Sequence, residues 1–388
     1  MELQHFLLEN LRAHKTIAGL RKSAFYADYG KQLESFLKTP QLFACPGARP
    51  RLRSFLRVAQ WNIEKGKRFH EILDCLQSDD VLKWADVLIL NEADYGMNRS
   101  QNRHVARDLA EALSMNMAFA PAHLELTPGT DEDRLPQGDN RESLQGNAIL
   151  SRYPVLEAHT LQLPVTFEPY EFEEKRFGWR NCVWAGIELG QSLLWVGSAH
   201  LELRNTPGCR ARQMLHIMEN LPGSARESYI LGGDLNTNGF SRGTFCRTLR
   251  SVFRLMLHSP PEMKSLLLHP ERGSEPLFDV LEKHGFAWEG FNSSEETART
   301  GIDSLEENSL LPVFLSERIR TRLEPYHGYL CFKLDWFLGK NMHALTGGQK
   351  RDIQTGIISS NPSCVKSDNA GAERLSDHRP IYVDLDLG

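Results

Sequence analysis

Short apolar segments alternate with helical patterns from Phe55 to the end of the chain, and this alternation constrains the fold more than any other feature. Several segments are continuous apolar runs, which are typical of strands covered on both faces. The predicted strands are Phe55–Ile63, Val87–Asn91, Ala148–Ser151, Val183–Leu189, Leu193–His200, Tyr229–Leu231, Phe332–Leu338 and Ile381–Leu387. The predicted helices are Phe69–Lys83, Asn102–Leu113, Cys209–Asn220, Ser241–Phe253 and Glu275–His284. The pattern predicts an α/β protein in which sheets pack together with helices outside.

The first part of the chain differs from this pattern. Apolar residues recur at helical spacing up to Leu37, and a stretch rich in Pro from Pro40 to Pro50 then interrupts them. We expect a helical N-terminal extension and linker over residues 1–54. The extension either packs on the domain that follows it or serves as a lid or partner-binding arm. Residues 292–329 are expected to form an insertion.

Cysteine usage and the lack of targeting signals bear on the compartment. The seven cysteines are widely spaced and form no CxxC pair, which argues against a disulfide framework or a zinc knuckle. The N-terminus lacks a basic segment followed by about 7–15 apolar residues. No apolar run is long enough to span a bilayer. We therefore expect a cytoplasmic protein with no transmembrane segment.

Acidic, amide and imidazole residues collect at the ends of the predicted strands, where a rigid scaffold meets solvent. They are Asn62, Glu64, Asn91, Glu92, Asp94, His200, Asp234, Asn236, Asp335, Asp377 and His378. Each motif alone has an ordinary explanation as a turn or a cap. Together, hard oxygen donors beside histidines suit a magnesium or manganese site with a general acid–base group.

The charge balance limits the partners of this site. Lys and Arg number 45 and Asp and Glu number 50, which gives a formal net charge of −5. Non-specific nucleic-acid binding depends on clustered basic residues, so the chain is not a general polyanion binder. A bound metal ion could still supply positive charge for a phosphate substrate. Nucleic acid is thus a possible partner that no basic excess supports.

The ordered motifs carry a family resemblance. They are Gln60-Trp61-Asn62-Ile63, Leu90-Asn91-Glu92, Gly146-Asn147-Ala148-Ile149-Leu150-Ser151, His200-Leu201, Gly233-Asp234-Leu235-Asn236, Leu334-Asp335-Trp336 and Ser376-Asp377-His378. From about Phe55 to Leu387 the chain resembles the endonuclease/exonuclease/phosphatase superfamily. The resemblance implies a four-layer α/β sandwich, with two mixed β-sheets packed face to face and helices on both outer sides. It also implies that residues 55–388 form a catalytic domain.

The resemblance further implies a metal site and the groups around it. Glu92 matches the metal-binding glutamate, Asn62 the asparagine beside it, and Asp377 an aspartate often near a metal. The implied cofactor is Mg²⁺ or Mn²⁺ at these residues.

The catalytic groups are likewise implied by resemblance. His378 matches the histidine that acts with the reacting phosphate, and Asp335 the aspartate that hydrogen-bonds it. Asp234 matches the aspartate that positions or deprotonates the attacking water. Asn236 and His200 match groups that contact phosphate.

Two further residues are expected to bind substrate. Asn147 lies in a block near the groove floor in relatives, and Arg180 precedes a strand on the expected active-site side. The alternative for Arg180 is a surface arginine that pairs with the acidic run at residues 171–174.

These observations predict a divalent-metal-dependent phosphoesterase that hydrolyses a P–O bond with activated water. A nuclease-like phosphodiesterase is the leading case. One alternative is a phosphomonoesterase acting on an inositol-phosphate, nucleotide or lipid-headgroup substrate, and another is a non-catalytic binding member of the family. We expect a monomer.

Overall fold

Two β-sheets form the centre of the molecule, and the computed structural model describes residues 2–190, 192–224, 226–301, 313–365 and 375–387. The larger sheet has the strand order β1-β4-β5-β3-β2-β15-β14, with β7 beside β4. Its strands are β1 (Gln41–Phe43), β2 (Phe55–Lys65), β3 (Val87–Tyr95), β4 (Asn116–Glu125), β5 (Leu144–Ser151), β7 (Arg176–Gly178), β14 (Ser363–Cys364) and β15 (Ile381–Asp386). The smaller sheet, in the order β13-β10-β9-β8-β6, contains β6 (Val155–Gln162), β8 (Asn181–Leu189), β9 (Ser192–His200), β10 (Ser228–Asp234) and β13 (Asp335–Lys340). Both sheets are mixed, since β2 with β3 and β9 with β10 pair in parallel.

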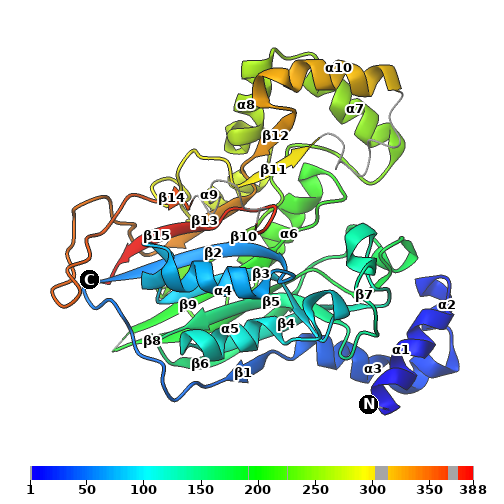
Figure 1. Cartoon of the computed structure of the whole chain (residues 1–388), viewed down its shortest axis with the longest axis horizontal. Helices are drawn as coiled ribbons and strands as arrows, with labels where there is room; N and C mark the ends of the chain where they lie inside the picture. The colour runs from blue at the N-terminus through cyan, green and yellow to red at the C-terminus, as the bar shows by residue number, and fades with distance from the viewer. Residues whose placement is uncertain (1, 191, 225, 302–312, 366–374, 388) are drawn as a thin grey trace.

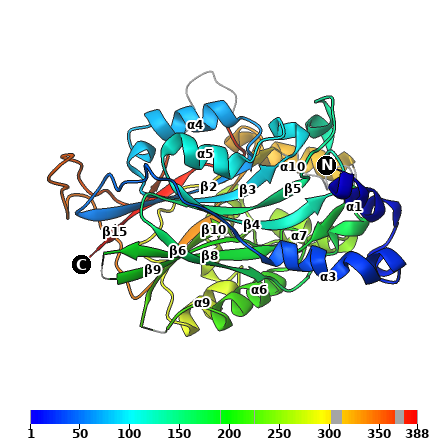
Figure 2. The ribbon, with the colours of Figure 1, turned by 90° about the horizontal axis from the view of Figure 1, so that it is seen from below.

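The sheets stack face to face, and helices cover their outer faces (Figures 1 and 2). The inner faces meet in an apolar layer that includes Val58 and Ile89 of the larger sheet and Val196 and Ile230 of the smaller one. Helices α4 (Phe69–Ser78) and α5 (Val105–Leu113) pack on the larger sheet. Helices α6 (Pro207–Glu219) and α9 (Leu277–Lys283) pack on the smaller sheet. The predicted four-layer α/β sandwich is thus confirmed.

Strands β4 and β6 were not predicted, for two different reasons. Strand β4 contains Asn116, Pro121, His123 and Glu125, which interrupt the apolar pattern although every residue of the strand is buried. Strand β6 is partly exposed along its length, so it lacks the continuous apolar run of a covered strand. Both strands depend on pairing with distant neighbours rather than on their own composition.

The N-terminal region holds helices α1 (Glu2–Ala13), α2 (Ile17–Arg21) and α3 (Ala24–Lys38) and also strand β1. Leu11 and Leu37 are buried in one apolar cluster with Leu124 and Phe177 of the core. Strand β1, in a stretch where the sequence indicated a linker, pairs with β4 at the edge of the larger sheet. The described part of this region therefore packs along the core and adds a strand to it.

A separate set of elements stands beside one end of the sandwich, at the top of Figure 1. It consists of α7 (Phe245–Met256), α8 (Pro260–Leu268), β11 (Ala298–Gly301), α10 (Val313–Leu323) and β12 (Tyr329–Phe332), and we call these elements the cap. The cap has its own apolar cluster, which contains Leu255, Ile319 and Leu330. The predicted insertion at residues 292–329 includes β11 and α10, and its residues 302–312 lie outside the described residues.

The remaining regular elements are short 3₁₀ helices at Leu82–Trp84, Asn98–Ser100, Asp131–Arg134, Pro169–Glu171, Pro270–Arg272 and Glu324–Tyr326. Among the helices that the structure describes, none has both the length and the apolar composition needed to cross a membrane.

Candidate active site

Several strand ends meet next to the cap and line a cavity of about 310 Å³. The core contributes polar residues to its lining, namely Glu92, Arg180, His200, Asp234, Asn236, Asp377 and His378. The cap contributes most of the apolar lining. Seven of the ten predicted site residues therefore share one cavity. The other three, Asn62, Asp335 and Asn147, are buried behind this lining.

Strand register brings the central residues together. Asp234, the last residue of β10, lies opposite His200 on the parallel strand β9 and opposite Asp335 on the antiparallel strand β13. The preceding Gly233 has φ +153°, and a Cβ atom there would lie 1.9 Å from the carbonyl oxygen of Ala199. Only glycine lets the two strands approach so closely at this point. The Gly-Gly-Asp motif thus positions a carboxylate between two neighbouring strands.

Irregularities at the ends of β2 and β3 aim two more polar side chains. The pairing of these strands shifts register after Asn62, and the pairing of β3 with β5 shifts between Leu90 and Ala93. Glu92 lies in the second shift with φ +56°, a left-handed conformation that is uncommon for a residue with a side chain. Bulges of this kind redirect side chains near functional sites. Here Glu92 lines the cavity, while the neighbouring Asn91 is fully buried.

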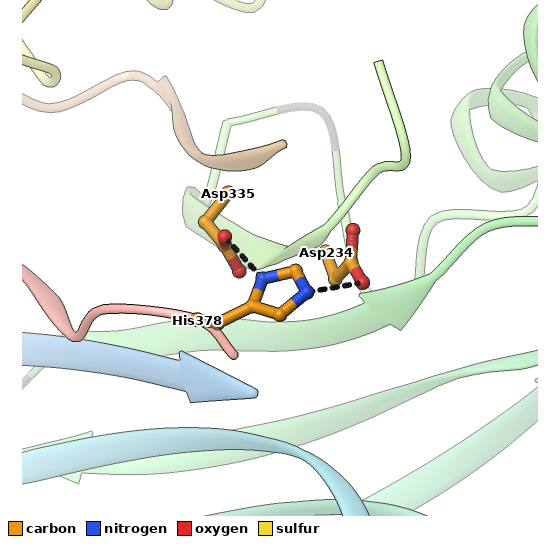
Figure 3. Close-up of side chains that lie close together, drawn as sticks. All are labelled: Asp234, Asp335 and His378. Carbon is orange, nitrogen blue, oxygen red and sulfur yellow. Dashed lines mark hydrogen bonds and ion pairs between the residues drawn. The ribbon is translucent and has the colours of Figure 1, made fainter. Parts of the chain in front are cut away.

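His378 lies between two buried carboxylates (Figure 3). Its Nδ1 atom is 2.7 Å from Oδ2 of Asp335, and its Nε2 atom is 3.7 Å from Oδ2 of Asp234. The other oxygen of Asp335 accepts a hydrogen bond of 2.9 Å from Nε2 of Gln60. The indole of Trp61 donates to the backbone carbonyl of His378 at 3.0 Å. These contacts fix the orientation of the imidazole.

The charges of this cluster follow from burial and proximity. Burial alone would lower the pKa of His378, but Asp335, Asp234 and Asp377 outweigh it and hold that pKa well above its usual range. Burial raises the pKa of Asp234 to about 7, although His378 opposes this shift. His378 is therefore a cation at neutral pH, whereas Asp234 can both release and accept a proton there.

Asp234, Asp335 and His378 are close enough to hold a metal, since one ligand atom from each lies within 4.8 Å of the others. A protonated imidazole, however, has no free lone pair for a metal. The donor set that suits a divalent cation consists instead of the carboxylate and amide residues next to this cluster. Carboxylate and amide oxygens, and no sulfur, are the ligands that Mg²⁺ or Mn²⁺ prefers.

Asn62, Glu92 and Asp377 offer such a donor set. The Asn62 amide nitrogen donates to Oε1 of Glu92 at 3.3 Å and to Oδ2 of Asp234 at 3.1 Å, which links this group to the cluster of Asp234, Asp335 and His378. Glu92 and Asp377 both reach the cavity. The backbone N–H of Asp377 donates to Oε2 of Glu64 at 3.2 Å, so a further carboxylate lies next to this set. These residues fit a hard divalent cation.

His200 and Arg180 lie against each other at the cavity wall. Nη1 of Arg180 is 2.8 Å from Nδ1 of His200, and Nε2 of His200 is 3.4 Å from Oδ2 of Asp234. Burial is the largest cause that lowers the pKa of His200 well below its usual range, and the positive charges of Arg180 and His378 lower this pKa further. His200 is therefore neutral and can donate one hydrogen bond. Nε of Arg180 is 3.8 Å from Oε2 of Glu202, so the Arg180 side chain lies along the cavity and away from residues 171–174.

Arg176 instead pairs with Glu174 of the acidic run considered for Arg180, and also with Glu125. Its guanidinium is 2.9 Å from Glu125 and 2.6 Å from Glu174. Arg176 and Arg180 are four positions apart but differ in their surroundings. Arg176 forms ion pairs within the protein, whereas Arg180 lines the cavity.

The amides of Asn236 and Asn147 are engaged within the protein. Asn236 donates its side-chain N–H to the carbonyl of Leu201 at 2.9 Å, and its backbone N–H donates to Oδ1 of Asp234 at 3.0 Å. Asn147 accepts from Asn91 at 2.9 Å and donates to Oδ1 of Asn181 at 2.7 Å. Asn236 lines the main cavity, whereas Asn147 lines only a void of about 10 Å³ beside it. The expected contact of Asn147 with substrate stays a prediction.

The sequence indicated Asn91 only as one of the polar residues at strand ends and Gln60 only as part of a motif, and it predicted no site role for either. Gln60 donates both to Asp335 and, at 3.2 Å, to Oδ1 of Asn91, and this same oxygen accepts from the backbone N–H of Asp234 at 2.9 Å. The sequence did contain a signal for Gln60. Residues two apart on a strand lie on the same face, and Gln60 is two residues before Asn62, a predicted site residue. The apolar lining from the cap was also missed, since its residues have no motif.

Comparisons with known proteins identify a family and similar folds. Residues 59–378 match the model of the Endonuclease/Exonuclease/phosphatase family, a range that contains every candidate site residue. No curated protein matches the chain in sequence.

Solved structures similar to the chain include an endonuclease/exonuclease/phosphatase family protein from Leptotrichia buccalis, with 13% identity, a TM-score of 0.49 and coverage of 86% of this chain and 100% of that chain. A mannosyl-6-phosphatase from Bacteroides thetaiotaomicron has 14% identity and a TM-score of 0.47, with coverage of 86% and 100%. The catalytic domain of human Nocturnin has 13% identity and a TM-score of 0.45, with coverage of 90% and 97%.

Proposed function

This chain belongs to the endonuclease/exonuclease/phosphatase family and is a hydrolase of phosphoester bonds, and we propose that it cleaves a phosphodiester with the help of a divalent cation. One observation carries the proposal. A cationic His378, held by Asp335, faces the same cavity as Glu92 and Asp234. Such an arrangement suits the attack of water on an anionic phosphate.

In this proposal Glu92, Asn62 and Asp377 hold the cation. When bound there, Mg²⁺ or Mn²⁺ supplies positive charge that neutralises phosphate oxygens. Asn62 orients the Glu92 carboxylate through its amide N–H. The residues that act on the substrate all come from residues 55–388, so we assign them to the catalytic domain and residues 1–54 to a packing extension.

Asp234 is the proposed base. Its Oδ2 atom holds the attacking water and accepts a proton from it, and a pKa of about 7 suits that task near neutral pH. The backbone N–H of Asn236 and the amide of Asn62 both donate to this carboxylate, which fixes its direction. Positioning of this kind supplies much of the rate enhancement in phosphoryl transfer.

His378 and His200 are the proposed donors to the phosphate. His378 donates from Nε2 while Asp335 holds the proton on Nδ1, and the neutral His200 adds a second donor. Such prearranged donors stabilise charge as it builds on the phosphoryl oxygens. Arg180 lies beside His200 and adds positive charge to the same wall.

The acidic lining favours a diester over a monoester. A phosphomonoester carries a charge of about −1.5 to −2 at pH 7 and a diester only one negative charge. Asp234, which lies outside the proposed metal ligands, lines the cavity, and its carboxylate would repel the more highly charged group more strongly. The nuclease case remains a prediction within the diester class.

A substrate panel tests the proposal. Bis(p-nitrophenyl) phosphate, p-nitrophenyl phosphate and a single-stranded oligonucleotide are incubated with the protein in Mg²⁺, in Mn²⁺ and in EDTA. We expect cleavage of the first compound that needs metal and falls by at least about 10³-fold in Glu92→Ala. Glu188→Ala, which removes an exposed glutamate from β8, is the matched control. Full activity in EDTA or in a folded Glu92→Ala protein would contradict the proposal.

A further inference from the structure

The cavity that contains the catalytic residues has a second wall of opposite character. Beyond the polar residues, the cap lines it with aliphatic and aromatic side chains, including Val252, Leu255, Met256, Ile319, Leu330 and Phe332. The polar and apolar residues border one continuous cavity of about 310 Å³, which lies at the small end of ordinary ligand pockets. A group attached to a phosphate at the polar wall therefore has the apolar wall next to it.

The apolar wall is attached to the catalytic residues by backbone pairing. Ala298 of β11 forms an isolated β-bridge with His378, and the backbone N–H of Arg379 donates to the carbonyl of Thr297 at 2.7 Å. The hydroxyl of Thr297 accepts from the backbone N–H of Asp335 at 3.1 Å. These bonds hold β11 of the cap beside Asp335 and His378. The juxtaposition of the two walls is thus a built feature of the fold.

The chemistry of the second wall favours an aliphatic occupant. Most of its apolar residues are branched or linear aliphatics rather than aromatic platforms, and base recognition depends on stacking. The two phenyl rings in the lining, Phe240 and Phe332, pack edge to face with ring centroids 6.1 Å apart. Binding of an alkyl or acyl group against these side chains would be favourable, because it removes apolar surface from water.

We propose that the substrate is a phosphoester that carries an aliphatic group of several carbons, and that this group enters the apolar wall of the cap. The inference rests on the proposed function for the position of the phosphate. It adds the chemical class of the neighbouring substituent.

Binding of n-alkyl phosphates tests the inference without requiring turnover. The affinities of methyl, butyl and octyl phosphate are measured by titration calorimetry in Mg²⁺, each below its micelle-forming concentration. Burial of each added methylene is expected to lower Kd by about threefold to fourfold until the cavity is full. Equal Kd values for the three compounds would overturn the inference. So would tighter binding of thymidine monophosphate than of octyl phosphate.

Two neighbouring positions on α7 provide matched variants. Val252 lines the cavity, whereas Phe253 is 62% exposed. Val252→Trp is expected to reduce the ratio of methyl to octyl Kd values toward one, and Phe253→Trp to leave that ratio unchanged. An unchanged ratio in a folded Val252→Trp protein would contradict the inference. If the Val252→Trp protein does not fold, the n-alkyl phosphate titrations of the unaltered chain still test the inference.

The two proposals can fail separately. Chain-length-dependent binding without any diester cleavage would remove the proposed function and keep the apolar subsite. Diester cleavage with flat binding would remove only the subsite. Co-sedimentation of the protein with phosphatidylcholine vesicles, with and without phosphatidic acid, then distinguishes a lipid substrate from a soluble one. Co-sedimentation that requires phosphatidic acid assigns the subsite to a lipid. No co-sedimentation with either kind of vesicle assigns the subsite to a soluble ester.

Discussion

The two walls of the cavity are built by regions of different construction. The polar wall lies on the ends of strands whose side chains fill the apolar layer between the sheets. The apolar wall belongs to the cap, whose own cluster is smaller and lies beside the sandwich. Thr297 and Ala298 connect the two regions by backbone hydrogen bonds. The candidate catalytic residues and the apolar lining therefore lie in separate packing units, so substitutions can be directed at one without the other.

The largest effect is expected from removing the charge of the polar wall. His378→Gln keeps a polar side chain but loses the cation between Asp335 and Asp234, so we expect diester cleavage to fall by about 10²–10⁴-fold. Rates on bis(p-nitrophenyl) phosphate and the circular dichroism spectrum check this. The matched control is His159→Gln, because His159 also faces a carboxylate, Glu157, but on the exposed strand β6. A folded His378→Gln protein with normal rates would show that the polar wall is not catalytic.

Truncation of buried aliphatic residues should separate the stabilities of the two regions. Ile230 lies in the layer between the sheets and Leu330 in the cap cluster, and both are buried. We expect Ile230→Ala to lower the free energy of global unfolding by about 2–5 kcal/mol. Leu330→Ala should instead increase hydrogen exchange mainly in α7, α10 and β12, because locally packed units can open by themselves. Equal effects of both variants on exchange throughout the molecule would refute a separate cap unit.

The same division explains how much of the fold the sequence predicted. Strands of the central layer, such as Val183–Leu189, were predicted because both faces are apolar and the signal is local. Strand β4 was missed because Asn116, His123 and Glu125 are buried by long-range contacts that no local pattern reveals. Strand β1 was missed because three residues carry too little periodicity.

The site divides in the same way. Glu92, Asp234 and His378 could be singled out as candidates because motifs at strand ends have a recognisable order, and the structure places all three at one cavity. The lining from α7 and β12 could not be predicted, because Val252 and Phe332 look like ordinary core residues in the sequence. Which apolar residues border a cavity depends on how distant elements pack, and that information is not local.

Acid should destabilise the core through the partly buried imidazole of His104. Burial, with Arg107, lowers the pKa of His104 to about 4, and its neutral Nδ1 accepts from the Arg107 backbone at the start of α5. Below pH 6.5 the unfolded chain takes up a proton that the folded chain does not, so stability falls as pH drops toward 4. We expect a loss of roughly 2–3 kcal/mol between pH 7.5 and 4 from this residue.

Urea unfolding at several pH values measures this slope. His104→Gln should flatten it, while the exposed His159→Gln should leave it unchanged. A slope that is unaffected by His104→Gln would mean that other groups dominate acid unfolding of the core.

The smallest effect tests the outer side of the cap. Phe253 is 62% exposed and Leu255, two residues along α7, is 7% exposed in the cap cluster. Because Phe253 contributes little buried area, Phe253→Ser should change the free energy of unfolding by less than about 0.5 kcal/mol. In the same urea titration, Leu255→Ala should lower the free energy of unfolding by about 2–4 kcal/mol if the cap unfolds together with the core. If the cap opens by itself, the variant should change only the local hydrogen exchange of the cap. A large loss of unfolding free energy in Phe253→Ser would instead place this side chain in a packed interface. The cap would then contact its surroundings on its outer side as well as at the cavity.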